Sequence, residues 1–282
     1  MPVSDSDLVV RDARSPGLVP AVLLVASAVP LFALRMPWVG YPMMVAALLI
    51  AWWLDRRSRA AGERAELFRD LLLIALGMAI VSSVSVAADI SWGNFFLLGF
   101  VLAAAVAVPY AISRWVFKDH RIRFPWNFRQ RWTRTQWLYL IGVIVAGYLI
   151  LPFYFVSSGV YLNWPAVHEW HEIGRLFVGV NAVGTWDELF FICTVFVLLR
   201  RHFPTWQANL LQAVVFVSFL WELGYQSWGP LLTIPFALVQ GFTFNLTKSL
   251  TYVLVVHLLF DAVVFLVIVS ARNPGALPIF LF

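Results

Sequence analysis

Apolar stretches about as long as a bilayer is thick recur along almost the whole chain. A transmembrane helix needs roughly 20 mainly apolar residues, and its backbone hydrogen bonds are satisfied within the segment. The sequence therefore predicts an all-α fold, a polytopic transmembrane helix bundle of about eight or nine membrane helices. The expected spans lie near residues 17–35, 37–54, 67–88, 94–114, 136–156, 185–201, 208–226, 229–245 and 249–270.

The composition excludes a soluble globular domain. Of the 282 residues, 61% are hydrophobic and 12% are charged, whereas soluble domains have roughly 25% charged residues. The net charge of +5 comes from basic residues in short loops, so it does not indicate a nucleic-acid partner. The single cysteine, Cys193, rules out an internal disulfide and a cysteine-rich metal site.

The basic residues are concentrated in every second connection between the expected spans. Under the positive-inside rule such loops face the cytoplasm. This alternation predicts an integral membrane protein with a cytoplasmic N-terminus. The basic connections are residues 55–64, residues 115–134, the pair Arg200 and Arg201, and the turn at Lys248.

We expect five regions along the chain. The core region contains the stretch 229–245, where Pro230 and Pro235 leave open a broken or re-entrant helix buried in protein. The regions are a flexible polar N-terminus (1–16), an N-terminal five-helix membrane region (17–156), a loop with an interfacial helix (157–184), core helices (185–270) and a C-terminal tail (271–282).

Three of the expected spans carry ionisable side chains at membrane depth. Asp187 and Glu188 open one span, Glu222 lies near the end of the next, and His257 and Asp261 share a helix face in the last. Such groups are costly inside a membrane and usually mark function. With a helical rise of about 1.5 Å per residue they reach overlapping depths, which predicts one buried polar centre.

Each of these groups also has a purely structural interpretation. Thr185 and Glu188 fit a capping box at the start of a helix, although this explains the adjacent acid less well. Glu222 lies near a helix end, where a long side chain can reach the membrane surface. His257 and Asp261 can form a self-satisfied hydrogen-bonded pair between helices.

Carboxylates and histidine, without thiols, suit either a zinc ion or a glutamate that activates water as a general base. Hydrolysis also needs a group that holds the developing oxyanion. The candidates for that role are Asn181, Tyr225 and Gln226. His168 and His171 share a helix face, and they either begin a polar helix at the membrane surface or contribute to the site.

The order of these motifs resembles the CPBP family of intramembrane metalloproteases, also called the Abi or CAAX protease and bacteriocin-processing family. Its motifs are Glu-Glu-x-x-x-Arg, Phe-x-x-x-His and His-x-x-x-Asn/Asp. The third motif matches at His257 and Asp261, and residues 245–250 resemble the family's Thr-Gly-Ser-Leu turn. The resemblance covers roughly Thr185 to Val269.

The first two motifs depart from the family pattern. The acidic pair at Asp187 is followed by Ile192 where the family has arginine. The second motif has no histidine, and either Glu222 or Leu223 stands in its place. A carboxylate can replace imidazole as a zinc ligand, but the exchange makes the site more acidic.

The resemblance implies a role for each residue. Asp187 would activate water, Glu188 would orient its neighbour, His257 would bind the water or a metal, and Asp261 would help to hold the oxyanion. Glu222 would be a substituted ligand. The implied cofactor is a divalent metal ion, expected to be zinc, with Asp187, Glu222 and His257 as its ligands.

We therefore expect an intramembrane metal-dependent endopeptidase that hydrolyses a peptide bond of a membrane-associated substrate, in a bacterial plasma membrane. Its partners would be that peptide or protein and the lipid bilayer. The altered motifs leave open a non-catalytic scaffold, immunity or partner-binding protein with the same fold. A proton- or cation-coupled transporter is disfavoured, because only the second half of the chain has polar groups at depth.

Overall fold

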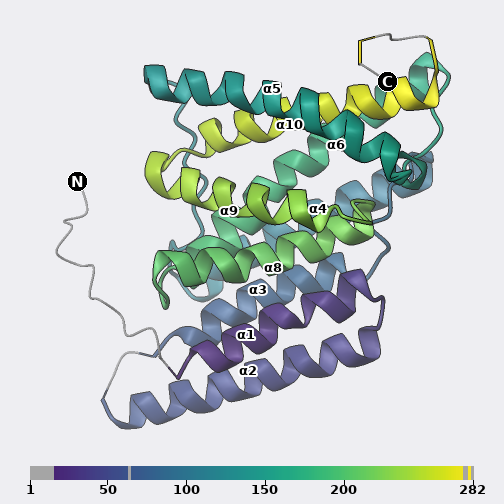
Figure 1. Ribbon diagram of the computed structural model, residues 1–282. Helices are drawn as coiled ribbons and strands as arrows, with labels where there is room; N and C mark the ends of the chain where they lie inside the picture. The colour runs from purple at the N-terminus through teal and green to yellow at the C-terminus, as the bar shows by residue number, and fades with distance from the viewer. Residues whose placement is uncertain (1–15, 63–64, 276–278, 281–282) are drawn as a thin grey trace.

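The computed structural model describes residues 16–62, 65–275 and 279–280, and every regular element within them is helical. The predicted all-α fold is confirmed. The helices run back and forth along one common direction (Figure 1). They are α1 (Leu18–Ala26) with the π-turn η2 (Val29–Ala33), α2 (Pro37–Ala60), α3 (Leu67–Val81), α4 (Trp92–Ala111) with η3 (Ile112–Val116), α5 (Arg134–Ser157), the 3₁₀ turn η4 (Val160–Asn163), α6 (Trp170–Asp187) with η5 (Glu188–Phe196) and α7 (Val197–Leu199), α8 (Thr205–Leu223), α9 (Pro230–Thr247) and α10 (Leu250–Arg272).

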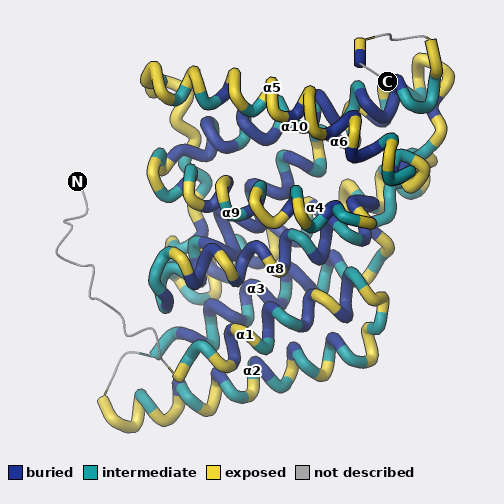
Figure 2. Tube along the Cα trace, viewed as in Figure 1, coloured by how far each residue is buried: buried dark blue, intermediate teal, exposed yellow. Residues whose placement is uncertain are grey.

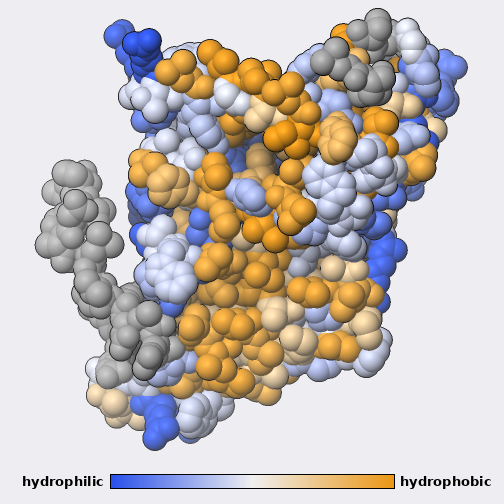
Figure 3. Space-filling model, viewed as in Figure 1, coloured by the Kyte–Doolittle hydropathy of each residue, from blue (hydrophilic) through white to orange (hydrophobic). Residues whose placement is uncertain are grey.

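The apolar surface and the helix lengths are those of an integral membrane protein. Within the described residues, five helices are long and apolar enough to cross a membrane, and α1 with η2 forms a shorter apolar helix. Apolar side chains cover the sides of the bundle, and hydrophilic ones gather at its two ends (Figure 3). The five are Pro37–Ala60, Trp92–Val116, Arg134–Ser157, Trp170–Leu199 and Leu250–Arg272.

Burial varies across the bundle. The outer helices α2 and α5 are exposed along much of their length, whereas α8 and the second half of the α6–α7 rod are mostly buried (Figure 2). The buried aromatic side chains around Trp186 belong to this inner part. Trp186 stacks on Phe190 with ring centroids 5.0 Å apart and packs against Phe219 at 4.8 Å.

The predicted start of the sixth span at residue 185 is wrong. One helical rod runs from Trp170 to Leu199, and it is 30 residues long. The Thr185 hydroxyl donates to the Asn181 carbonyl oxygen (2.8 Å), as it does inside a helix, so the capping pattern at Glu188 is coincidental. The expected interfacial helix is therefore the first half of a membrane helix.

The true start of α6 is a different capping box. The Glu172 carboxylate accepts hydrogen bonds from the backbone N–H groups of His168 (3.0 Å) and Glu169 (3.2 Å). The interpretation of the histidine-containing string as a polar helix start is confirmed.

The proline-containing stretch forms one continuous helix, α9, and not a broken one. Pro230 is its first residue, where a missing backbone N–H costs nothing. Pro235 lies inside the helix, where it removes one backbone hydrogen-bond donor without breaking the helix. Lys248 ends the helix with φ 51°, at the position where the resembled turn has glycine, and the Ser249 hydroxyl then accepts from the backbone of α10.

The basic connections lie together at one end of the bundle. Arg121 and Arg201, from two different connections, both bind Asp70 near the start of α3. The Leu250 backbone N–H donates to the Pro125 carbonyl oxygen (3.0 Å), which brings the α9–α10 turn to the same end. The contacts agree with the alternation expected from the sequence, while the cytoplasmic location of this end stays a prediction.

Asp70 is the centre of a charge cluster at this basic end. Its side chain is 1% exposed and contacts Arg121 (2.7 Å), Arg201 (2.6 Å) and His202 (2.6 Å). Glu66 joins the same two arginines at 2.6 and 2.7 Å. Partial burial raises the pKa of Glu66, but the two arginines outweigh it and the net pKa lies below the ordinary value. The cluster therefore joins three connections through close pairs of opposite charge.

Replacing Asp70 tests how much this cluster stabilises the bundle. We expect Asp70→Asn to lower the free energy of unfolding by about 3 kcal/mol, because removing one partner leaves buried arginine charge uncompensated. The measurement is the thermal unfolding midpoint of the detergent-purified protein. Asp89→Asn, at an exposed position bonded to Ser91, is the matched control. An unchanged midpoint in both variants would contradict this role.

Candidate active site

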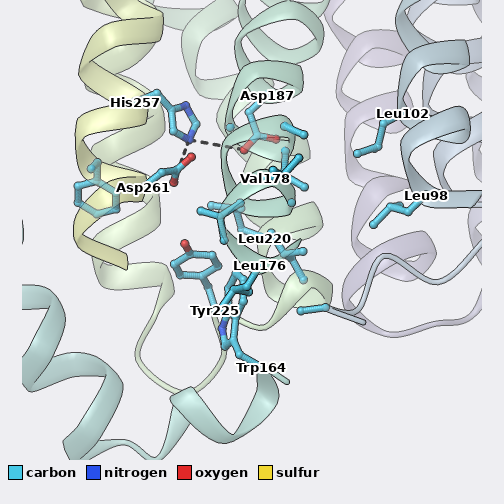
Figure 4. A pocket seen from close by; sticks show the side chains of 18 of the residues that line it. Leu98, Leu102, Trp164, Leu176, Val178, Asp187, Leu220, Tyr225, His257 and Asp261 are labelled. Atoms are coloured by element: carbon cyan, nitrogen blue, oxygen red, sulfur yellow. Dashed lines mark ion pairs between the residues drawn. The ribbon is translucent and has the colours of Figure 1, made fainter. Parts of the chain in front are cut away.

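His257 is the centre of the buried polar site. Its Nδ1 lies 2.7 Å from Glu188 Oε1. Its Nε2 lies 3.6 Å from Asp187 Oδ2 and 3.8 Å from Asp261 Oδ1 (Figure 4). All four side chains are buried. Three carboxylates from two helical rods thus surround one imidazole, which confirms the expected convergence of these four residues.

The acidic pair reaches His257 from two directions because of where it lies in the rod. Asp187 is the last residue of α6 and Glu188 the first of the π-helical segment η5. Successive helical residues point about 100° apart, so the two carboxylates approach different ring atoms. In η5 the Thr194 hydroxyl donates to the carbonyl oxygen of Leu189, five residues back. Such wide turns are frequent at functional sites.

Gly184 allows the two rods to approach closely. A β-carbon at this position would overlap the Asp261 carboxylate and lie 3.3 Å from Cδ2 of His257. A larger side chain would have to displace the Asp261 carboxylate from its position. The glycine one turn before the acidic pair therefore sets the distance between α6 and α10.

Gln240 on α9 is a site residue that the sequence analysis missed. Its buried amide Nε2 donates to Glu188 Oε1 (2.7 Å) and lies 3.1 Å from the Val253 carbonyl oxygen. Glu188 Oε1 therefore faces both the amide and the imidazole, which fixes its position. The signal in the sequence was a glutamine within an apolar helix, a group that is costly to bury without partners.

Several carboxylate oxygens at the centre have no hydrogen-bond partner within the described protein. They are both oxygens of Asp187, Oε2 of Glu188 and Oδ2 of Asp261. Buried polar groups are nearly always hydrogen-bonded, and exceptions often have a catalytic explanation. Because Asp187 and Asp261 line a cavity, their free oxygens are directed to a place where a ligand can bind.

The cavity has a volume of about 310 Å³ and mainly apolar walls from α4, α6, α8, α9 and α10. Asp187, His257 and Asp261 lie at one end of it (Figure 4). Phe236 meets the imidazole edge-on, with ring centroids 4.9 Å apart. The site is a small polar centre inside an apolar chamber, the usual character of a ligand site.

Glu222 is not part of this centre, so the predicted role as a substituted ligand is wrong. Its carboxylate lies 3.2 Å from Arg35 and accepts from the Val86 backbone N–H at 3.3 Å. The next residue, Leu223, lines the cavity instead. The depth along α8 was suitable, but a rotation of about 100° per residue turns Glu222 toward the α3–α4 connection.

Of the predicted zinc ligands, Asp187 and His257 therefore lie together, and Glu222 lies apart from them. Among the described residues, no group of three or more histidine, cysteine, aspartate or glutamate side chains is arranged to hold a metal ion. The residues present do not fit the implied metal. The zinc ion stays a prediction without a ligand set, and no step below depends on it.

The remaining histidine candidates lie outside the cavity. His168 Nδ1 is 2.9 Å from the Asn273 side-chain oxygen, and both His168 and His171 are exposed near the start of α6. Neither replaces the missing histidine of the second motif. Ile192, at the position of the family's arginine, is buried among apolar side chains.

Of the three oxyanion candidates, only Tyr225 lines the cavity. Asn181 and Gln226 donate to backbone carbonyl oxygens near them in the chain. The Tyr225 hydroxyl points toward Asp261 (Figure 4). Within the described protein, no hydrogen-bond partner competes for it.

The comparisons with known proteins agree with this geometry. The family model described as type II CAAX prenyl endopeptidase Rce1-like matches residues 169–263. This segment is Rce1-like. The resemblance read from the motifs is confirmed, and the match begins earlier than expected, where α6 begins. No curated protein and no solved structure matches the chain.

The Rce1-like segment contains all the residues of the polar centre and about a third of the chain. The description of that family names a prenyl endopeptidase. The chain departs from the family motifs at Ile192, where the family has arginine, and at Glu222 or Leu223, where the family has histidine; of these two, Leu223 lines the cavity.

The bond from His257 to Glu188 predicts the protonation pattern of the ring. Because Glu188 accepts at Nδ1, we expect the Nδ1 proton to be fixed in the wild type and the ring signal to shift in Glu188→Gln, where a weaker, neutral amide oxygen replaces the charged acceptor. The measurement is the ¹⁵N NMR spectrum of labelled histidine side chains, with His257→Gln to assign the signal. Glu222→Gln is the control and should leave that signal unchanged. An unchanged His257 signal in Glu188→Gln would contradict the geometry.

Proposed function

We propose that this protein is an intramembrane endopeptidase that hydrolyses a peptide bond of a membrane-associated substrate with an activated water molecule. The observation that carries the proposal is the orientation of His257. Its Nδ1 is bound by Glu188, while its Nε2 faces Asp187 and Asp261 in the cavity. The Rce1-like match over the same residues supports this class of reaction.

Asp187 and His257 are the proposed water-activating pair. With Glu188 holding the Nδ1 proton, Nε2 is the basic nitrogen, as in hydrolases where a carboxylate orients a histidine. The 3.6 Å between Nε2 and Asp187 Oδ2 is too long for a direct hydrogen bond. A water molecule beside both atoms can bond to each of them. Asp187, with both oxygens otherwise unpartnered, takes the water proton.

The remaining steps follow from proton balance. The hydroxide oxygen forms a bond to the carbonyl carbon, and the proton held by Asp187 passes to the amide nitrogen as the C–N bond breaks. The direct products are one carboxylic acid and one amine, and the acid ionises to a carboxylate when its proton passes to the amine or to solvent. The Tyr225 hydroxyl donates a hydrogen bond to the oxyanion, a contribution that is typically large in a site shielded from water. Asp261 can donate there only in its protonated form.

A non-catalytic, partner-binding membrane protein is the second candidate function. The observation that favours it is the pair of apolar replacements, since Ile192 and Leu223 remove a cation and an imidazole from the family pattern. The polar centre then has three carboxylates and a single imidazole. The two functions differ in whether a peptide bond is broken.

Hydrolysis in ¹⁸O-labelled water decides between them. The detergent-purified protein is incubated with a library of synthetic apolar peptides, and mass spectrometry detects new C-termini that contain one ¹⁸O atom. We expect cleavage by the wild type. Asp187→Asn and His257→Gln should each lower the rate by at least roughly 100-fold, the usual contribution of a general base.

Two further variants make the test specific to this geometry. Tyr225→Phe should lower the rate by roughly 100-fold, the loss typical of one oxyanion donor. Glu222→Gln, which removes an acid outside the cavity, should cleave at close to the wild-type rate. The absence of ¹⁸O incorporation by the folded wild type would reject the peptidase and leave the partner-binding function.

Metal removal tests the remaining expectation. Because the proposed water-activating groups act without a metal, we expect chelator-washed protein to keep its cleavage rate and to contain less than one metal ion per chain by mass spectrometry. A rate that is lost on chelation and restored by zinc would overturn the metal-free mechanism, and His257→Ala would then show whether the imidazole is a ligand.

A further inference from the structure

The cavity is bordered by connections at only one end of the bundle. The α3–α4 connection contributes Ala88, Asp89 and Ile90, the segment before α6 contributes Trp164, and the α8–α9 connection contributes Tyr225. Among the described residues, none from the four basic connections lines it. The cavity therefore extends from the polar centre toward the end opposite the basic connections.

The path can be followed from the outside inward. Asp89 is exposed and lines the cavity, so it lies at the mouth. Trp164 and Leu176 follow, and Tyr225 lies between them and the carboxylates of the polar centre (Figure 4). Val178 on α6 is also exposed and lines the cavity, which opens it sideways toward lipid.

The other end of the bundle is closed. On the basic side of the polar centre, the residues of the α6–α7 rod and of α10 are buried and packed, including Phe196, Leu199, Leu250 and Val253. The Asp70 cluster joins three connections beyond them. A peptide arriving from the basic end would have to separate this packing.

The arginines at the two ends of the bundle differ in how many of them are bound by other groups of the protein. At the mouth end, Arg35 is paired with Glu222, and Arg272 donates to the backbone carbonyl oxygens of Leu162 and Trp164. At the basic end, exposed cations remain, with Arg129 and Arg131 among them. By the positive-inside rule the end with the excess of basic residues is cytoplasmic.

We propose that the peptide bond reaches the polar centre from the non-cytoplasmic side, so the substrate is an apolar peptide segment exposed at that surface or in the adjoining lipid leaflet. This inference rests on the proposed peptidase function. The apolar cavity walls, among them Leu98, Leu102 and Leu220, suit an extended apolar chain. A segment confined to the cytoplasm has no path to the carboxylates.

Cysteine labelling in intact bacterial cells tests the side of the mouth. In a Cys193→Ala background, Asp89→Cys places one thiol at the mouth and Gln130→Cys places one in a basic connection. A membrane-impermeant maleimide should label Asp89→Cys in intact cells and Gln130→Cys only after permeabilisation. Labelling with the reverse pattern, or labelling of both thiols in intact cells, would overturn the proposal.

A second measurement separates this inference from the peptidase function. Proteoliposomes are prepared in which maleimide labelling has established the orientation of the protein. A peptide already identified as a substrate by ¹⁸O incorporation is then added either on the mouth side or on the basic side. Cleavage should occur only from the mouth side, and a bulky maleimide on Asp89→Cys should lower it at least tenfold. Equal cleavage from the basic side would overturn the route while leaving the hydrolysis intact. If no peptide is cleaved, the peptidase fails and the labelling still reports the side of the mouth.

Discussion

The short contact between His257 and Glu188 determines the arrangement of the second half of the chain. A carboxylate and an imidazole inside a membrane are each costly, and together they satisfy one another at 2.7 Å. The contact requires α6 and α10 to approach closely, which Gly184 permits. Besides His257, the Glu188 carboxylate has a partner on α9, the amide of Gln240. The position of every other polar group in the cavity follows from this bond between two helical rods.

The two buried charge clusters of the molecule are built on different principles. Around Asp70, every acid of the cluster lies close to an arginine. Around His257, three carboxylates share a single imidazole and several oxygens have no protein partner. The Asp70 cluster, with its acids and arginines paired, needs no role other than holding the connections together. An unbalanced one beside a cavity requires a ligand, a proton or a reaction.

The sequence predicted the features that depend on hydrophobic length and on helical period. Apolar stretches of membrane thickness gave the helical class, and the four-residue spacing placed His257 and Asp261 on one face. The prediction from sequence failed where the direction of a side chain depends on rotation about the helix axis. Glu222 has the expected depth, but its side chain points to Arg35. Thr185 was misassigned because a capping pattern also occurs inside helices. Gln240 was missed because a lone amide becomes informative only when its carboxylate partner is known.

The π-helical segment after the acidic pair makes the site depend on chain length as well as on residue identity. Nine residues, Glu188 to Phe196, pass through wider turns than the α-helices at either side. If the width of the turns stayed the same, deleting one residue there would rotate the acidic pair by about 100° relative to α7. Many substitutions along η5 would leave the carboxylates facing the imidazole, whereas a single insertion or deletion would turn them away. Sequences related to this one should therefore vary in composition through this segment and stay constant in its number of residues.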